Sequence, residues 1–198
     1  MEGQPRGRHL FVLAHGFGGS KYDLHLVQKV ITYSQSKDII FMHSGANEGK
    51  TDGDLGQMGL RMSQEIFSFI QDNCPDDKLA KISFIGYSLG GVIIRAALPY
   101  LHNLRDKFES YVSLCSPHLG YLYKKGKLFS TGMWIMNNIN ESTVISQLRY
   151  TDGNSVKDSY LYRLSMQEGL DWFQNILLVS SSQDEWAPYE SARMQITN

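Results

Sequence analysis

The sequence has little of three things: cysteine, uninterrupted apolar runs and excess charge of either sign. Its only cysteines are Cys74 and Cys115, which are too few for a disulfide scaffold and are typical of a reducing compartment. No apolar run reaches the roughly 18 residues that a membrane-spanning helix needs. Lys and Arg total 19 and Asp and Glu total 20, giving a formal net charge of -1, so no nucleic-acid partner is indicated.

The opening residues also lack a feature, namely the long apolar stretch and cleavage site of a secretory signal, so we expect a cytoplasmic protein. What the chain does have is an ordinary globular composition, with 42% hydrophobic and 12% aromatic residues. Its 198 residues are the length of one domain, and we expect residues 1–198 to form a single one.

Short apolar runs recur along the chain, nearly continuous in Ile, Val, Leu and Phe: His9–Ala14, Asp38–His43, Lys81–Gly86, Glu109–Leu114 and Asn175–Ser180. Such runs are typical of parallel strands that helices cover on both faces. Helical spacing between the runs predicts helices over Leu24–Tyr33, Leu60–Ile70 and Leu89–Leu101, with Val30 and Phe67 among the inward-facing residues. The alternation predicts an α/β fold, a mostly parallel sheet of about five strands with helices on both faces.

The stretch from Tyr121 to Leu164 interrupts this alternation. It is too long for a bare loop, so we expect a small helical insertion over residues 121–164 that forms a lid. Its first part, Tyr121–Phe129, mixes basic and aromatic residues, as a lid that seeks a membrane surface would. The alternative is a solvated charged loop beside ordinary packing aromatics.

The segment Gly86–Gly91 (GYSLGG) stands where the third strand is expected to end and the third helix to begin. G-x-S-x-G in this context indicates a nucleophile elbow, a sharp turn that needs small residues on either side and exposes the hydroxyl of Ser88. The helix that begins at Leu89 offers unpaired N–H groups to a developing oxyanion. The alternative is a glycine-rich turn that only packs closely.

The loop His15–Gly19 (HGFGG) follows the first strand and can aim a second backbone N–H, that of Phe17, at the same oxyanion. A dinucleotide-binding loop is disfavoured because the third glycine of its motif would fall at Lys21. We interpret His15 as a loop-shaping or pocket-lining residue rather than a base, and we place Tyr87 in the same substrate pocket.

Two further segments end strands at the edge of the sheet that carries Ser88. Asp184 follows the last strand and is the candidate orienter of a catalytic histidine; the alternative is an Asp that caps a turn before Pro188. Cys115 and His118 follow the fourth strand. No third group is evident to orient a thiol–imidazole pair, so we interpret Cys115 as a buried small thiol and His118 as part of the pocket wall.

The motifs HGFGGS, IGYSLGG, SPHLG and SSSQDEWAPYESA, in this order and spacing, resemble the family named "Putative serine esterase", a group of lipase-like α/β-hydrolases. The resemblance runs from His9 to about Met194 and suggests the hydrolase domain of larger eukaryotic proteins. It implies an α/β-hydrolase sheet, Ser88 as nucleophile, Asp184 as triad acid, and the N–H groups of Phe17 and Leu89 as oxyanion donors. It also implies an ester substrate, lipid esters included. No cofactor is implied, and the histidines lack the spacing of a metal site.

One part of the expected triad is missing from the sequence. In this fold the histidine follows the acid along the chain, but all six histidines precede Asp184. Three explanations remain open. The chain is a fragment, incomplete at its C-terminal side; it is a non-catalytic lipid- or protein-binding module; or His118 or His15 substitutes as the base. The leading hypothesis is ester hydrolysis by the intact domain through an acyl-enzyme, which the sequence does not separate from acyl transfer to an alcohol.

Overall fold

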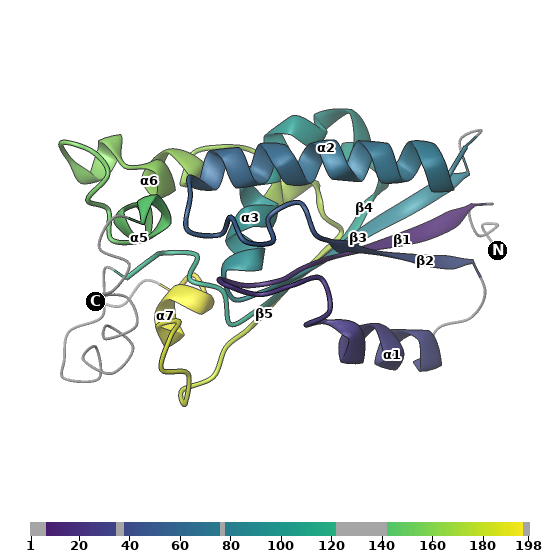
Figure 1. Ribbon diagram of the computed structural model, residues 1–198, viewed down its shortest axis with the longest axis horizontal. Helices are drawn as coiled ribbons and strands as arrows, with labels where there is room; N and C mark the ends of the chain where they lie inside the picture. Colours follow the sequence, from purple (N-terminus) through teal and green to yellow (C-terminus); the bar gives the residue numbers. More distant parts are fainter. Residues whose placement is uncertain (1–6, 35–37, 76–77, 122–141, 196–198) are drawn as a thin grey trace.

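The computed structural model describes residues 7–34, 38–75, 78–121 and 142–195. Its strands are β1 (Arg8–Ala14), β2 (Ile39–Ser44), β3 (Leu79–Tyr87), β4 (Phe108–Leu114) and β5 (Asn175–Val179). They form one sheet in the order β2-β1-β3-β4-β5, and every neighbouring pair is parallel (Figure 1). The predicted parallel sheet is confirmed, with small shifts at the strand ends. All five strands therefore end at one edge, where the candidate site residues lie.

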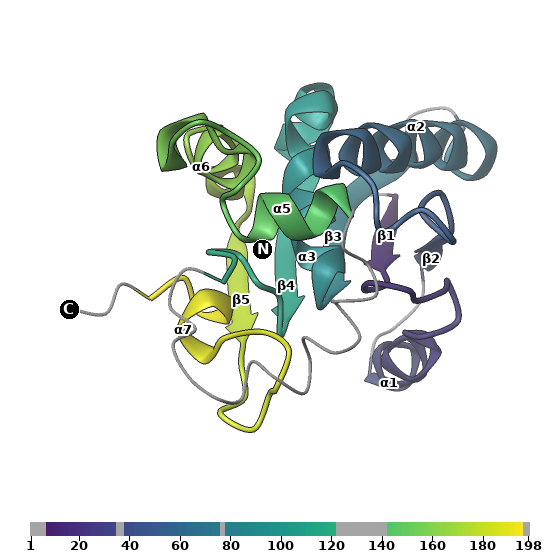
Figure 2. The same ribbon diagram turned by 60° about the vertical axis from the view of Figure 1, so that its left-hand side comes forward.

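Helices cover both faces of the sheet (Figures 1 and 2). The longer ones are α1 (His25–Ser34), α2 (Leu55–Asn73) and α3 (Leu89–Ala97). The chain tightens after α3 into a 3-10 helix, η1 (Leu98–Lys107), because Pro99 has no N–H to continue the α-helical hydrogen bonds. Shorter elements follow β4 and β5: α5 (Thr143–Leu148), η2 (Val156–Asp158), α6 (Tyr160–Ser165), η3 (Leu170–Trp172) and α7 (Tyr189–Ala192).

Two hydrophobic clusters lie on opposite faces of the sheet. On one face, alternate residues of β1 such as Leu10 and Val12 pack with Met58 and Met62 of α2 and with the apolar side of α3. On the other, the intervening residues Phe11 and Leu13 pack with Ile85 of β3 beneath α1. Because side chains alternate along a strand, one strand thus supplies different residues to each cluster.

Some side chains depart from their predicted burial. Val30 is 62% exposed, since α1 contacts the sheet through Val27 and Ile31 and turns Val30 away from that stripe. Phe67 is 40% exposed because it follows the buried Ile66, and one residue is about 100° of helix rotation. The inward placement of Val30 and Phe67 was therefore wrong. The edge strand β5 is also not fully covered, with Leu177 49% exposed.

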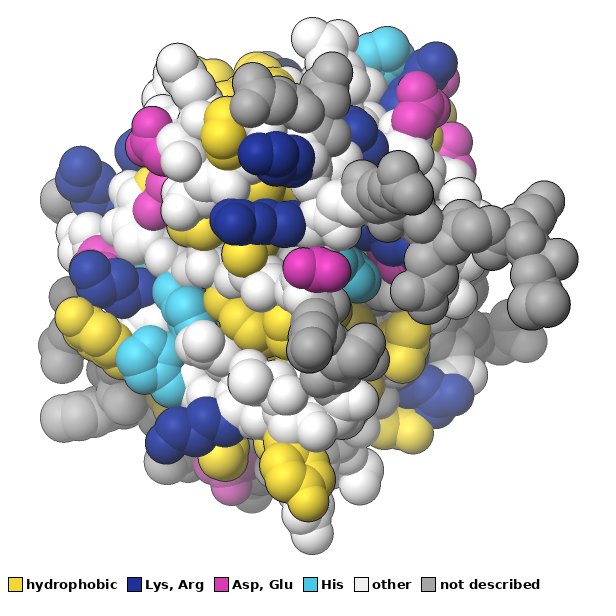
Figure 3. Space-filling model, turned by 90° about the vertical axis from the view of Figure 1, so that its right-hand side faces the viewer, with side chains coloured by type: hydrophobic (Ala, Val, Ile, Leu, Met, Phe, Trp, Pro, Cys, Tyr) yellow, Lys and Arg dark blue, Asp and Glu magenta, His cyan; other side chains and the backbone are white. Residues whose placement is uncertain are grey.

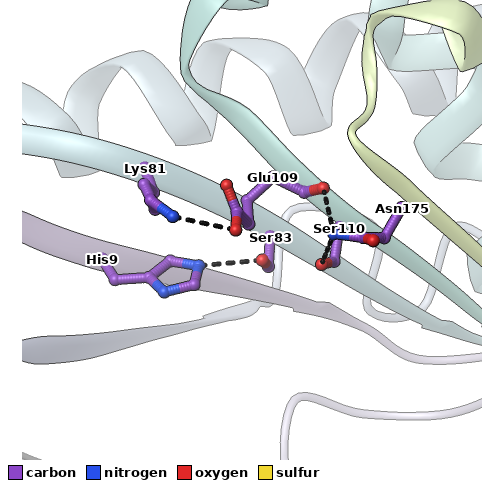
Figure 4. A network of polar contacts seen from close by, with 6 residues as sticks. All are labelled: His9, Lys81, Ser83, Glu109, Ser110 and Asn175. Atoms are coloured by element: carbon purple, nitrogen blue, oxygen red, sulfur yellow. Dashed lines mark hydrogen bonds and ion pairs between the residues drawn. The ribbon is translucent and has the colours of Figure 1, made fainter. Parts of the chain in front are cut away.

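A row of polar side chains crosses the sheet near the beginnings of the strands (Figure 4). His9 Nε2 lies 2.8 Å from Ser83 Oγ, and Lys81 Nζ lies 2.8 Å from Glu109 Oε1. Asn175 Nδ2 donates to the Glu109 carbonyl oxygen at 3.5 Å. Burial lowers the pKa of His9, and the nearby Glu109 charge opposes that shift. This row lies at the opposite end of the strands from Ser88.

Viewed from the beginnings of the strands, the surface carries basic and acidic side chains interspersed with apolar ones (Figure 3). Among the coloured side chains of this view, no large area of one charge sign is visible. Among the described residues, no helix combines the length and apolar character needed to cross a bilayer.

Candidate active site

Ser88 occupies the sharp turn between β3 and α3. Its backbone angles are φ 52° and ψ -125°, a strained conformation for a residue with a side chain. The N–H of Ser88 donates to the carbonyl oxygen of Leu114 at 2.8 Å, which ties the turn to the end of β4. The strained turn at the strand end is the geometry that the G-x-S-x-G motif predicts.

Glycines on either side of Ser88 allow this turn to close. A Cβ at Gly86 would collide with the backbone of Gly91, and a Cβ at Gly90 would collide with the carbonyl oxygen of Ala14 on β1. A Cβ at Gly16, in the loop after β1, would lie 2.9 Å from Ser88 Cβ. The small residues therefore let the end of β1, the end of β3 and the start of α3 pack closely around Ser88.

Ser88 opens into a cavity of about 330 Å³ at the carboxyl edge of the sheet. Five segments far apart in the sequence supply its walls. These are Gly16, Phe17 and Asp23 after β1; Tyr87, Ser88 and Leu89 at the elbow; Cys115, Pro117 and Tyr121 after β4; Ile145 and Leu148 of α5; and Asp184 and Trp186 after β5. This volume is at the small end of ligand pockets, which span roughly 300–1,000 Å³.

The two predicted oxyanion donors lie beside Ser88. Leu89 is the first residue of α3, so its N–H has no acceptor within the helix. Phe17 follows Gly16, whose backbone packs against Ser88, and both Phe17 and Leu89 line the cavity. The arrangement can present two backbone N–H groups to an oxygen bound next to the Ser88 hydroxyl.

Asp184 lines the same cavity from the segment after β5. Its Oδ1 accepts hydrogen bonds from the N–H groups of Trp186 at 2.8 Å and Ala187 at 2.9 Å. Asp184 therefore caps the turn before Pro188, which was the alternative interpretation, and faces the cavity with Ser88 as well. The two interpretations are compatible in this structure.

Cys115 is a cavity residue that sequence reasoning underestimated. It is partly exposed and lines the cavity rather than being a buried small thiol. Its φ is 53°, and its N–H donates to the carbonyl oxygen of Val179 at 2.8 Å, which joins the ends of β4 and β5. Burial raises the pKa of the thiol, and the hydrogen bond to Asp184 and the charge of that carboxylate raise it further. The thiol is therefore protonated at neutral pH.

His118 is buried and engaged away from the cavity. Its Nε2 lies 2.7 Å from Ser113 Oγ, and Arg95 Nη1 donates to its carbonyl oxygen at 3.1 Å. Burial holds the pKa of His118 well below its usual range, and the nearby Arg95 charge lowers it further. The side chain is neutral at pH 7. It is not among the residues that line the cavity.

The remaining histidines do not line the cavity that the described residues form either. His15 is buried, with Nδ1 2.9 Å from the Gly16 carbonyl oxygen. His9 belongs to the polar row near the beginnings of the strands. His43 contacts Gln28 at 2.6 Å and the ring of His25, while His102 contacts Arg105 at 2.8 Å. The cavity that the described residues form is thus lined by Tyr87 but by no histidine, so His15 and His118 are not among its lining residues.

Several cavity residues carry no motif of their own. Ile145 and Leu148 come from α5, and their spacing of three indicates only one face of a helix. Tyr121 is at the edge of the predicted insertion, and burial raises its pKa to about 12. The rest of the basic and aromatic stretch, residues 122–129, lies outside the described residues. Within the described part of the chain, no three His, Cys, Asp or Glu side chains cluster as a metal site.

The parallel sheet, with a strained serine turn after β3, defines the class of lipase-like α/β-hydrolase folds. The chain belongs to the family described as "Putative serine esterase (DUF676)", which matches residues 4–195.

Two curated relatives come from Saccharomyces cerevisiae. The putative lipase ROG1 is 31% identical over 124 residues, covering 57% of this chain and 18% of that protein. The putative lipase YDL109C is 26% identical over 170 residues, covering 79% of this chain and 25% of that protein. The chain thus spans a quarter or less of the length of these relatives.

Solved structures share the fold at low identity. The lipase BlEst2 of Bacillus licheniformis, in its propeptide form, aligns with a TM-score of 0.58 and 17% identity, covering 91% of this chain and 37% of that one. Phospholipase PlaB of Legionella pneumophila aligns with a TM-score of 0.55 and 15% identity, covering 89% and 40%. At this identity the likeness establishes the α/β-hydrolase fold.

Proposed function

We propose that this domain is the nucleophile-bearing core of a serine hydrolase that cleaves carboxylic esters, lipid esters among them, through an acyl-enzyme. The observation that carries the proposal is the strained turn that presents Ser88 to a cavity shared with Asp184. A serine in an ordinary packing turn has no need of that strained backbone or of an acid facing the same cavity. The names of the yeast relatives as lipases support a lipid ester.

In the proposed reaction, Ser88 Oγ attacks the ester carbonyl carbon as its proton passes to a base. The carbonyl oxygen becomes an oxyanion held by the N–H groups of Phe17 and Leu89; such a donor is typically worth about 3–4 kcal/mol. The tetrahedral intermediate then expels the alcohol, which takes the proton, and leaves an acyl-enzyme on Ser88. Water attacks this ester in the same way and releases the carboxylic acid.

We assign the role of base to a histidine oriented by Asp184, as in other triads. We assign it to none of the six histidines of this sequence. A serine without such a base is a weak nucleophile at neutral pH. His15 and His118 do not line the cavity, and His118 is already engaged by Ser113 and Arg95. A non-catalytic module that binds esters or lipids is the second candidate, and the absence of a histidine from the described cavity wall favours it.

Fluorophosphonate labelling, read by intact mass on the full-length native protein and on this chain, tests the proposal. Labelling should disappear in Ser88→Ala and persist in Ser182→Ala, a matched change on the exposed loop after β5. The pH dependence of labelling is the second readout. A histidine base gives a rate that levels off above a pKa near 6.5, whereas an unassisted serine gives a rate that keeps rising at alkaline pH.

Weak turnover alone does not discriminate, since an oxyanion hole and binding can retain about 10³–10⁴-fold catalysis without a complete triad. Labelling that survives Ser88→Ala would refute the hydrolase proposal. A full-length protein that binds esters but is not labelled would establish the binding module instead.

A further inference from the structure

The helix α5 joins the cavity to the body of the domain. Ile145 and Leu148 line the cavity that Ser88 opens into, while Val144 and Gln147 are buried on other sides of the same helix. Both α5 and the start of α2 lie at the carboxyl edge of the sheet (Figure 1). The position of α5 therefore decides the shape of one cavity wall.

Gln147 ties α5 to the beginning of α2. Its Oε1 accepts the N–H of Leu55 at 2.9 Å, and its Nε2 donates to Asp54 Oδ2 at 2.6 Å. Asp54 caps α2 with its other oxygen, which accepts the N–H of Gln57 at 2.8 Å. Because Leu55 and Gln147 are both buried, no solvent would replace these bonds, and breaking them would leave buried polar groups without partners.

Both ends of α5 are held as well. At its beginning, Ser142 Oγ donates to the carbonyl oxygen of Asp52 at 2.8 Å, and the N–H of Val144 donates to the same oxygen at 3.3 Å. At its end, the carbonyl oxygen of Leu148 accepts the N–H of Tyr121 at 2.8 Å. Displacing α5 from the cavity would break bonds at three places at once.

The wall that α5 presents is apolar. The helix α5 carries no charged residue, its cavity residues are Ile145 and Leu148, and Pro117 extends the apolar lining. At ~30 Å³ for an atom the size of water, 330 Å³ holds roughly ten non-hydrogen atoms. Such a cavity fits an ester group with a short to medium uncharged chain.

We propose that α5 forms a fixed wall that limits the length of the acyl chain. In this arrangement Ile145 and Leu148 determine the accepted chain length, and Gln147 is the positioning residue for the wall. The substrate class is an ester whose acyl group is uncharged and no longer than about eight carbons. The inference rests on the proposed function in taking the Ser88 cavity as the ester site. The binding of an apolar chain there does not require hydrolysis.

Two measurements separate the wall from the chemistry. The first is calorimetric binding of methyl butyrate, methyl octanoate and methyl dodecanoate to Ser88→Ala, in which no ester is cleaved. The second is the rate of fluorophosphonate labelling of the full-length protein with butyl, octyl and dodecyl probes. Affinity and rate should rise from four to eight carbons and fall at twelve.

Variants at the wall should shift this profile. Leu148→Ala removes three carbons from the wall. It should raise the affinity for the twelve-carbon ester by about tenfold or more, since burial of one methylene contributes ~0.8 kcal/mol. Ile145→Phe should weaken the eight-carbon ligand relative to the four-carbon one. Leu26→Ala, a matched change at an exposed position of α1, should leave the profile unchanged.

Gln147 is tested by a pair of changes. Gln147→Ala should flatten the chain-length profile, because α5 loses its tie to α2. Gln147→Glu keeps an acceptor for Leu55 but places a second carboxyl beside Asp54, so the tie returns only when that pair holds a proton. The profile of Gln147→Glu should therefore sharpen as the pH is lowered, which a loss of stability alone would not produce.

Circular dichroism should show that both variants are folded. An unchanged chain-length profile in both Leu148→Ala and Ile145→Phe would then overturn the proposal that α5 limits the acyl chain. A rate of Ser88 labelling that does not depend on the chain length of the probe would also overturn the proposal for α5, and it would leave the hydrolase proposal intact. Chain-length-dependent binding without any labelling supports the wall and counts against hydrolysis.

Discussion

Asp184 and Cys115 line the same cavity where β5 and β4 end, and the Asp184 carboxylate raises the pKa of the Cys115 thiol beyond the effect of burial. The Oδ1 atom of Asp184 is already held by the N–H groups of Trp186 and Ala187. The acid thus has a fixed orientation before any imidazole binds. The loop geometry and the proposed catalytic role therefore depend on different features of one side chain, its acceptor oxygen and its charge.

This separation predicts different outcomes for two substitutions of Asp184. Asp184→Asn keeps an oxygen to accept from Trp186 and Ala187, so the free energy of unfolding should change by less than about 0.5 kcal/mol. Asp184→Ala removes the acceptor and should lower it by about 1 kcal/mol. Both should lose most of the esterase activity of the full-length protein, because a neutral group stabilises an imidazolium poorly. Urea denaturation and ester turnover measure the two effects.

Glu168→Gln, at an exposed position outside the cavity lining, is the matched control and should retain both stability and activity. Full activity in Asp184→Asn would remove Asp184 from the proposed triad. Equal stability of the Asn and Ala variants would mean that the capping hydrogen bonds contribute nothing measurable.

The elbow predicts a large effect of adding one methyl group. In Gly90→Ala the new Cβ would collide with the carbonyl oxygen of Ala14, so helix α3 must move away from β1. We expect a loss of about 3 kcal/mol or more in the free energy of unfolding, or no folded protein, because overpacking a core costs about 1–3 kcal/mol even where it is relieved.

Gly53→Ala is the control for this change, since its nearest neighbour, the Lys50 carbonyl oxygen, would lie at an ordinary 3.5 Å. A Gly53→Ala protein should be as stable as the parent or more so by up to about 1 kcal/mol. Denaturant titration of both variants decides the matter. Equal stability of Gly90→Ala and Gly53→Ala would contradict the tight approach of α3 to β1.

Burial of His118 predicts that acid destabilises the domain. Its pKa lies well below 6.5 in the folded protein and near 6.5 in the unfolded chain, so below pH 6.5 the unfolded state binds more protons. This contribution to stability is fully present above pH 6.5 and is lost as the pH falls, by up to about 1.4 kcal/mol per pH unit. Urea denaturation at pH 7.5, 6 and 5 measures the slope.

In His118→Gln the slope should be shallower, although the variant is less stable at pH 7.5. A residual slope is expected because burial also lowers the pKa values of His9 and His43. His102→Gln, a change at an exposed histidine, should keep the parent slope. An unchanged slope in His118→Gln would show that this imidazole is not the acid-sensitive group.

Much of the fold could be predicted from the sequence. The five strands were located because nearly continuous apolar runs and the turns that follow them are local signals. The errors at Val30 and Phe67 have a different origin. Local periodicity predicts an apolar stripe along a helix, but it does not predict which residues of that stripe contact the sheet. In α1 these residues are Val27 and Ile31.

The site divides in a similar way. Five candidate site residues lie at the ends of strands that meet at one edge of the parallel sheet, so their convergence could be predicted. The structure brings them around one cavity: Phe17, Tyr87, Ser88, Leu89 and Asp184. His15 and His118 follow strands at the same edge, yet neither lines that cavity. The sequence placed them at an edge but did not say which way their side chains point. The lid prediction for residues 122–141 lies outside the described part of the chain.

The sequence by itself determined the class of fold and the turn at Ser88, because the apolar runs and the close approach of Gly86 to Gly91 involve near neighbours in the chain. Only the tertiary structure decided what surrounds that serine. The bond from Gln147 to Leu55 spans 92 residues, and no local pattern specifies it. Buried polar groups must find partners wherever the folded chain brings them, and that requirement places α5, and with it Ile145 and Leu148, in the cavity wall.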